Sequence, residues 1–126
     1  MSKNNTYTIL VIDDSTTNIV LIEAVLKEKG YHIQTALSAK EAYKIIKSKK
    51  PDLIFLDLLM PKISGFDFLY KIRNEKTTRN VPVIVITAVN DDEYKHKALK
   101  LGATEVMYKP VDIQAVIQKV EKYASH

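Results

Sequence analysis

The chain has 126 residues, of which 46% are hydrophobic, and this length suits one globular domain with a single core. It contains no cysteine, which excludes disulfide bonds and thiolate metal sites. Lysines and arginines outnumber acidic residues by 19 to 15. We interpret this scattered excess as solvated helix faces rather than a nucleic-acid surface, because no aromatic residues or recognition motif accompany the lysines.

No segment of the sequence predicts insertion into a membrane. The longest apolar runs, residues 53–56 and 83–86, are far too short to cross a bilayer. Residues 1–6 form a polar lead-in without the apolar stretch and cleavage site of a signal peptide. We therefore expect a soluble, cytoplasmic protein without a membrane partner.

Five short runs rich in Val, Ile, Leu, Thr and Tyr are predicted to be strands. The first, third and fourth runs are almost continuously apolar, which is typical of strands buried on both faces of a parallel sheet. We expect these three strands to be central. The five runs cover residues 8–12, 32–36, 53–57, 83–87 and 105–108.

Each predicted strand is followed by a helical pattern with its own start and stop signals. Ser15 can cap a helix that ends at Gly30, and Ser38 with Glu41 forms a capping box. The last helix carries a single apolar stripe that faces a core. The predicted helices cover residues 16–29, 39–48, 66–74, 93–101 and 113–123.

Strict alternation of strand and helix predicts an α/β fold, a doubly wound five-stranded parallel sheet with five helices. No repeat or linker divides the chain, so we expect a single domain over residues 1–126, with a core over about residues 7–123. In such sheets, sites form outside the carboxyl ends of the strands. The residues that follow each strand are therefore the first candidates for function.

Five polar side chains occupy these strand ends, namely Asp13, Asp14, Asp57, Thr87 and Lys109. We expect them to converge on one crevice. Three crowded carboxylates repel one another unless a cation neutralises them, and Mg²⁺ prefers oxygen ligands of this kind. The sequence therefore predicts a magnesium site at this edge of the sheet.

The same residues suit phosphoryl transfer to an aspartate. Asp57 closes an apolar run that would fix it at the edge of a dry core, as a nucleophile requires. Mg²⁺ and Lys109 could shield the charge of an incoming phosphoryl group, and Thr87 could donate a hydrogen bond to one of its oxygens. Pro110 after Lys109 permits a cis peptide bond, which the sequence leaves open.

Taken as a spaced set, these motifs resemble the response-regulator receiver family of two-component systems, the CheY-like superfamily, over about residues 7–123. The motifs are IDDS, DLIFLDLLMP, a glycine, TA, GA and KP, at residues 12–15, 52–61, 65, 87–88, 102–103 and 109–110. The resemblance implies a flavodoxin-like (βα)₅ fold. It also implies phosphoryl transfer from a phosphohistidine on a sensor histidine kinase or phosphotransfer protein.

The resemblance assigns roles to individual residues. It implies that Asp57 is the phosphoacceptor, that Asp14 binds Mg²⁺ directly, and that Asp13 acts mainly through water. The backbone carbonyl of Leu59 is expected to be a further metal ligand. Leu59 and Val89 also occupy the two positions that tune phosphoryl lifetime in the family, and because neither can hydrogen-bond a water, we expect slow self-dephosphorylation.

The resemblance further implies that Thr87 and Lys109 bind the phosphoryl oxygens and report their arrival. Family members usually carry Tyr or Phe three residues before the lysine, where this chain has Val106. An aromatic switch at that position is therefore excluded, although Tyr108 shares the strand face. We expect the loop and helix that follow Thr87 to carry the change instead.

The first predicted helix offers a docking surface for the phosphodonor. We place Leu21, Ile22, Val25 and Leu26 on its core-facing stripe, whereas Val20 projects away at about 100° per residue. An exposed apolar residue beside the acidic site could contact a helical donor, as this helix does in the family, although single exposed apolar residues are common.

Three other classes of protein deserve comparison. An aspartyl-phosphate hydrolase of the haloacid dehalogenase type needs a second acid where Leu59 stands, and a nucleotide- or flavin-binding module would not place Asp13 and Asp14 in its first turn. A pseudo-receiver that binds partners without phosphorylation generally loses the acids or the lysine, which this chain keeps. We therefore predict a signalling domain that catalyses only its own phosphorylation and dephosphorylation.

The wider organisation of the protein is less constrained. Because Met1 lies just before the first strand, we expect the domain to begin its protein. A downstream protein, a fused effector domain and a stand-alone regulator are all compatible with the end of the chain. A homodimer through the fourth and fifth helices is also compatible.

Overall fold

Strands and helices alternate along the whole described chain, which in this computed structural model comprises residues 7–58 and 64–124. The alternation confirms the predicted α/β class. The strands are β1 (Thr8–Ile12), β2 (His32–Ala36), β3 (Leu53–Leu56), β4 (Val83–Thr87) and β5 (Glu105–Tyr108). The helices are α1 (Thr16–Glu28), α2 (Ala39–Ser48), α3 (Gly65–Arg73), α4 (Asp92–Lys100) and α5 (Ile113–Ala124).

All five strands form one parallel sheet in the order β2-β1-β3-β4-β5. The expectation that the first, third and fourth strands are central is confirmed. Every residue of β1, β3 and β4 is buried, whereas β2 and β5 at the edges are only partly buried. Continuous apolar runs are found in the central strands because helices cover both of their faces.

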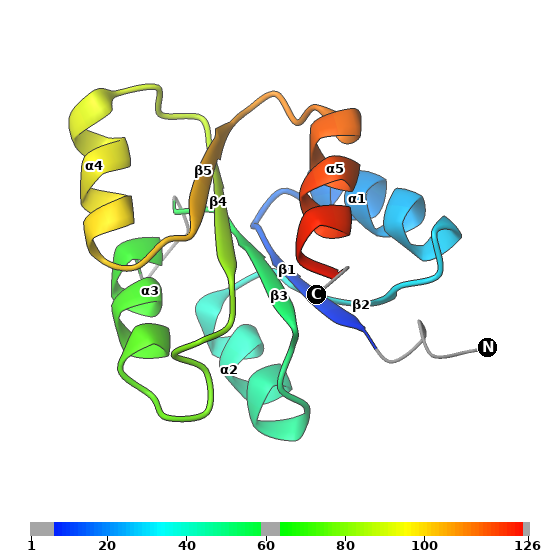
Figure 1. Ribbon diagram of the computed structural model, residues 1–126, viewed down its shortest axis with the longest axis horizontal. Helices are drawn as coiled ribbons and strands as arrows, with labels where there is room; N and C mark the ends of the chain where they lie inside the picture. The colour runs from blue at the N-terminus through cyan, green and yellow to red at the C-terminus, as the bar shows by residue number, and fades with distance from the viewer. Residues whose placement is uncertain (1–6, 59–63, 125–126) are drawn as a thin grey trace.

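Helices cover the two faces of the sheet in different numbers (Figure 1). On one face, Leu10 and Ile12 of β1 pack in a core with α2, α3 and α4. On the other, Ile9 and Val11 of the same strand pack with α1 and α5. The alternation of side chains along a strand therefore divides the core into two layers. No helix in the described residues has the length and apolar character that crossing a bilayer requires.

The predicted helix caps form, with one difference in detail. The hydroxyl oxygens of Ser15 and Ser38 accept hydrogen bonds from backbone amides in the first turns of α1 and α2. In the predicted capping box, however, the Glu41 carboxylate accepts from the amide of Leu37 at 2.8 Å, one residue before the cap. The effect is equivalent, because an amide at the entry to the helix is satisfied.

The structure moves several predicted ends by one residue and corrects the placement of one side chain. Strand β3 ends at Leu56, so Asp57 lies just outside it, although its amide still donates to the carbonyl of Ile12 at 2.9 Å. Leu21 was predicted on the core-facing stripe of α1 but is 42% exposed. The buried residues of α1 are Ile19, Ile22 and Leu26, and a step of about 100° from Ile22 turns Leu21 toward solvent.

An ionic cluster around Glu105 connects β5 to α5. The Glu105 carboxylate contacts Lys119 Nζ at 2.5 Å and Lys122 Nζ at 3.0 Å, and it accepts a hydrogen bond from the Tyr123 hydroxyl. Burial by itself raises the pKa of Glu105, but the hydrogen bonds from Lys119, Tyr123 and Lys122 outweigh it and lower this pKa from 4.5 to about 2.

This cluster predicts a specific acid sensitivity. Because the pKa of Glu105 is lower in the folded chain, its stabilisation is present above about pH 4.5 and is lost as the pH falls toward 2. We expect Glu105→Gln to cost about 1 kcal/mol at pH 7, allowing for solvent screening, and little at pH 2. Urea unfolding at both pH values measures this, with Glu121→Gln on the exposed side of α5 as control. An equal loss at both pH values would contradict the ionic explanation.

Candidate functional site

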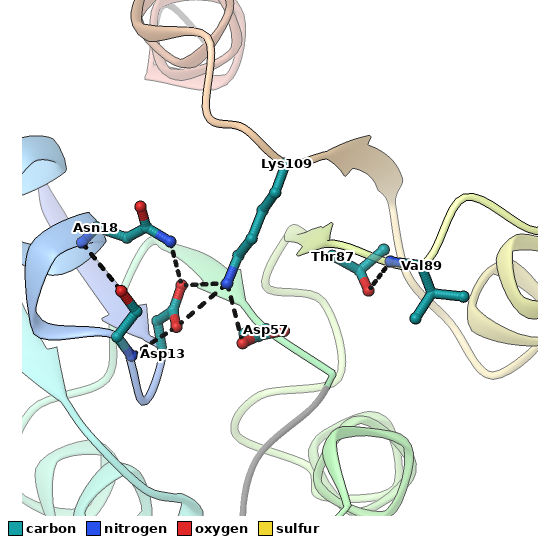
Figure 2. Close-up of polar contacts among 7 residues, drawn as sticks. Asp13, Asn18, Asp57, Thr87, Val89 and Lys109 are labelled. Atoms are coloured by element: carbon teal, nitrogen blue, oxygen red, sulfur yellow. Dashed lines mark hydrogen bonds and ion pairs between the residues drawn. The ribbon is translucent and has the colours of Figure 1, made fainter.

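The five side chains predicted to converge lie at the carboxyl edge of the sheet. Asp13 and Asp14 follow β1, Asp57 follows β3, Thr87 ends β4 and Lys109 follows β5. Figure 2 shows Lys109 extending between Asp13 and Asp57, with Thr87 on the far side of Asp57 from Asp13. The structure therefore brings the predicted residues to one place, as expected for neighbouring parallel strands.

The three aspartates form a compact acidic cluster. One carboxylate oxygen from each of Asp13, Asp14 and Asp57 lies within 4.8 Å of the others. Asp13 and Asp57 are buried, whereas Asp14 is exposed. Two carboxylates are thus held rigidly by the core, and the third lies on the solvent side of the cluster.

A single ammonium group pairs with both buried carboxylates. Lys109 Nζ lies 3.2 Å from Asp13 Oδ2 and 3.2 Å from Asp57 Oδ2. Burial by itself lowers the pKa of Lys109, but the charges of Asp57 and Asp13 outweigh it and hold this pKa above 10.5. Lys109 is therefore a permanent cation between two acids.

The charges of this cluster fit a divalent cation. Three carboxylates and one ammonium leave two negative charges in excess, which one such ion would balance. The side-chain donors are all oxygens, as Mg²⁺ prefers, and no histidine belongs to the cluster within the described residues. The predicted carbonyl ligand, Leu59, lies outside the described residues.

Local hydrogen bonds orient Asp13. Its Oδ1 accepts from the amide of Ser15 at 2.9 Å, and its Oδ2 accepts from Asn18 Nδ2 at 3.4 Å. The amide of Asp13 donates to the carbonyl of Ala36 on β2 at 3.1 Å. Sequence reasoning missed Asn18, and the available signal was its place in the first turn of the helix that Ser15 caps.

The Thr87 hydroxyl is held by its own loop. Its oxygen accepts from the amide of Val89 at 3.2 Å, as Figure 2 shows, which leaves its proton available for donation. The Val89 side chain is half-buried and apolar. Slow self-dephosphorylation, which we connected with Val89 and Leu59, stays a prediction.

The backbone of Lys109 is also tied to β4. Its amide donates to the carbonyl of Thr87 at 2.8 Å. The peptide bond between Lys109 and Pro110, which the sequence left open, is cis. The two predicted phosphoryl-binding residues are therefore connected directly through the main chain.

Gly65 packs against the backbone beside Asp57. Its amide donates to the carbonyl of Leu58 at 3.0 Å. A Cβ at this position would lie only 2.4 Å from Leu58 Cα and 2.9 Å from the carbonyl oxygen of Asp57. A glycine is required here because the start of α3 touches main-chain atoms that cannot move away without shifting Asp57.

The fold and the site together define a flavodoxin-like α/β domain that carries acids and a lysine at the carboxyl edge of its parallel sheet. Comparison with known proteins agrees, because the family model of the response regulator receiver domain matches residues 9–121. The chain therefore belongs to the response-regulator receiver family of two-component systems.

Relatives and solved structures support this membership. Response regulator PleD of Caulobacter vibrioides is 36% identical over 104 residues, which are 82% of this chain and 23% of PleD. The alkaline phosphatase synthesis transcriptional regulatory protein PhoP of Bacillus subtilis is 34% identical over 90% of this chain and 46% of its own length. A two-component response regulator from Clostridium difficile has a TM-score of 0.89 and 31% identity, covering 94% of this chain and 96% of that one.

The chain spans about a quarter of PleD and about half of PhoP. The similarity to these two regulators thus concerns only a part of each.

Proposed function

We propose that Asp57 accepts a phosphoryl group from a phosphohistidine on a sensor histidine kinase or phosphotransfer protein. The observation that carries this proposal is the buried Asp57 carboxylate, paired at 3.2 Å with a lysine that a second buried acid also holds. A carboxylate held in this way at the sheet edge suits nucleophilic attack on an electrophile. The chain would thus be a single receiver domain over residues 1–126.

The transfer itself needs few groups. A carboxylate oxygen of Asp57 forms a bond to phosphorus as the bond from phosphorus to the donor imidazole nitrogen breaks. Lys109 can then exchange its contact with Asp57 for one with a phosphoryl oxygen. The Thr87 hydroxyl can donate a hydrogen bond to another of these oxygens.

Asp13, Asp14 and Asp57 would hold Mg²⁺, which is how the acidic cluster would be neutralised. The bound ion would supply positive charge to the crowded carboxylates and to the oxygens of the incoming group. Asp14, as the exposed member, is suited to direct ligation, and Asp13, with hydrogen bonds from Ser15 and Asn18, is suited to ordering water. The carbonyl of Leu59 would complete the proposed set.

Intact mass measurement after incubation with acetyl phosphate and Mg²⁺ tests this function. We expect one phosphoryl adduct per chain, stable in acid and labile in base, and no adduct when EDTA replaces Mg²⁺. A chain that gains no adduct and binds no beryllofluoride would instead be a pseudo-receiver that binds partners without phosphorylation. The beryllofluoride arm separates this outcome from a merely short phosphoryl lifetime.

Exposed apolar residues near the acidic site favour a docking surface for the donor. Val20 and Leu21 on α1 are 56% and 42% exposed, and Leu37 in the loop after β2 is 45% exposed. A helical donor could cover these residues while it presents its phosphohistidine to Asp57. The output would pass to a downstream protein or a fused effector domain, since PhoP is a transcriptional regulatory protein about twice as long as the matched segment.

The proposed conformational change on phosphorylation does not depend on an aromatic side chain of β5. Val106 packs in the core layer that contains α4, where it has no ring to rotate. Tyr94, in the first turn of α4, is an aromatic residue that packs against the same core layer as Val106. Its ring centroid lies 4.9 Å from that of Phe66 in an edge-to-face contact. Burial and then the charge of Asp57 raise the pKa of Tyr94, so its hydroxyl lies within electrostatic reach of the phosphoacceptor.

A beryllofluoride titration followed by amide NMR would test this route. We expect the largest shifts in residues 88–101, because a group bound at Asp57 would draw Thr87 inward and displace the loop and α4 behind it. Tyr94→Leu, which keeps an apolar contact with Phe66, is expected to reduce the shifts within α4 without preventing beryllofluoride binding. Shifts confined to the residues around Asp13 and Asp57 would contradict the route through α4.

A further inference from the structure

A groove of about 700 Å³ lies at the amino edge of the sheet, opposite the edge that carries Asp57. It is lined by the last turns of α2 and α3 and by the segment that leads into β4, and these helices lie side by side in Figure 1. A smaller hollow of about 220 Å³ shares Lys50 and Thr77 with it. The larger groove has the size of a small-molecule site.

The walls of this groove are apolar where the two helices meet. Tyr43 and Ile46 of α2 and Ile72 of α3 line it. The Tyr43 ring is fixed by contact with the Phe68 ring, 5.0 Å away between centroids. These side chains give a planar, apolar group a firm surface to pack against.

Basic side chains surround these apolar walls. Lys47, Lys50 and Lys71 line the groove, against a single acid, Glu75. Lys71 Nζ lies 5.0 Å from the centroid of the Tyr43 ring. Within the described part of the chain, none of the three lysines belongs to an ion pair with an acidic side chain. The groove thus carries more positive than negative charge, three lysines against Glu75.

We propose that this groove binds a nucleotide, with the base against Ile46 and Tyr43 and the phosphates near Lys47 and Lys50. The ammonium groups of the lysines can bind phosphate as point charges. The apolar walls can bind a nucleotide base, which inorganic phosphate lacks. Glu75 accepts hydrogen bonds only, so it suits ribose hydroxyls or an exocyclic amine.

Charge and shape together favour a nucleotide over other anions. A simple phosphate would fill a small part of about 700 Å³ and would leave the apolar walls in water. A purely apolar ligand would leave Lys47 and Lys50 without a partner. The proposed ligand satisfies both, and none of its contacts involves the acidic cluster, so this inference stands apart from the proposed phosphorylation of Asp57.

Titration with ATP in the presence of EDTA tests the proposal, since without metal the three carboxylates of the acidic cluster repel the phosphates of ATP. Amide NMR should show saturable shifts in α2, α3 and residues 74–78. In the double variant Lys47→Glu/Lys50→Glu we expect binding to weaken at least tenfold. The matched control is Lys40→Glu/Lys44→Glu, which makes the same charge change on α2 at exposed lysines outside the groove and should change affinity less than twofold.

Three results would overturn the proposal. The first is an absence of shifts at millimolar ATP, and the second is equal weakening in both double variants, which would mean nonspecific attraction. The third is equal affinity for inorganic triphosphate and ATP, which would exclude a role for the base. Retained binding of beryllofluoride with Mg²⁺ in each variant would demonstrate that the fold is intact.

Discussion

Asp57→Asn is expected to abolish the phosphoryl adduct formed with acetyl phosphate and Mg²⁺, because an amide oxygen is not a nucleophile of useful strength. The substitution preserves the shape of the side chain, and Lys109 keeps its contact with Asp13 at 3.2 Å. We therefore expect the free energy of unfolding to stay within about 1 kcal/mol of the native value. Intact mass measures the adduct, and urea unfolding measures the stability.

The control for this substitution is Asp67→Asn, which removes an exposed acid from α3 and leaves the acidic cluster unchanged. It should accept a phosphoryl group as the native chain does. An adduct that persists in Asp57→Asn, or that disappears in Asp67→Asn, would mean that the phosphoacceptor lies elsewhere.

Gly65→Ala is expected to have the largest effect on stability. The added Cβ would lie 2.4 Å from Leu58 Cα and 2.8 Å from the Leu58 carbonyl oxygen, where real Cβ atoms are not found. Main-chain atoms cannot rotate away, so α3 or the segment after β3 must shift. We expect a loss of about 3 kcal/mol in the free energy of unfolding, together with slower phosphorylation because Asp57 moves with that segment.

Gly30→Ala is the control for Gly65→Ala, because it tests backbone strain at a glycine where an added Cβ makes no steric contact. Gly30 has a φ of 96°, which disfavours alanine, but a Cβ there meets nothing within 4 Å. We expect a loss of about 1 kcal/mol from backbone strain and no change in the phosphorylation rate. A Gly65→Ala chain no less stable than Gly30→Ala, with native phosphorylation, would contradict a packing role for Gly65.

The expectations for Asp57 and Gly65 share one physical cause, which is that the acidic cluster depends on rigid surroundings. Asp13 and Asp57 repel each other, and their closeness is tolerated because Lys109 contacts both. Lys109→Met would leave two buried acids facing each other. We infer that the pairing stabilises the cluster before any metal or phosphoryl group arrives.

The order of the elements was predictable from the sequence because local patterns carry it. Buried parallel strands need continuous apolar runs, and amphipathic helices need a periodic apolar pattern with a capping residue. Both patterns lie within short stretches of neighbouring residues. Predicted ends differed by at most one residue, as for Asp57 after β3 and Asp92 at the start of α4. Leu21 was misplaced because a short apolar cluster fits more than one helix face.

The candidate residues at the strand ends were predictable for a similar reason. In a doubly wound sheet, topology alone places the carboxyl ends of the strands on one edge, so Asp13, Asp57 and Lys109 had to be near one another. Their spacing also carried the family resemblance that the matched family model bears out over residues 9–121. Contacts within single turns, such as Ser15 with Asn18, followed from capping rules.

By itself, then, the sequence determined the order of strands and helices, the edge that carries the acids, and the family. Only the tertiary structure decided which groups touch, because those contacts join distant segments. Lys109 pairs with Asp13, 96 residues away in the sequence, and Arg73 Nε donates to the Gly102 carbonyl at 2.8 Å, 29 residues away. The groove between α2 and α3 had no sequence signal, since helix packing alone creates it. Periodicity records which face of an element is buried, whereas packing geometry determines what that face meets.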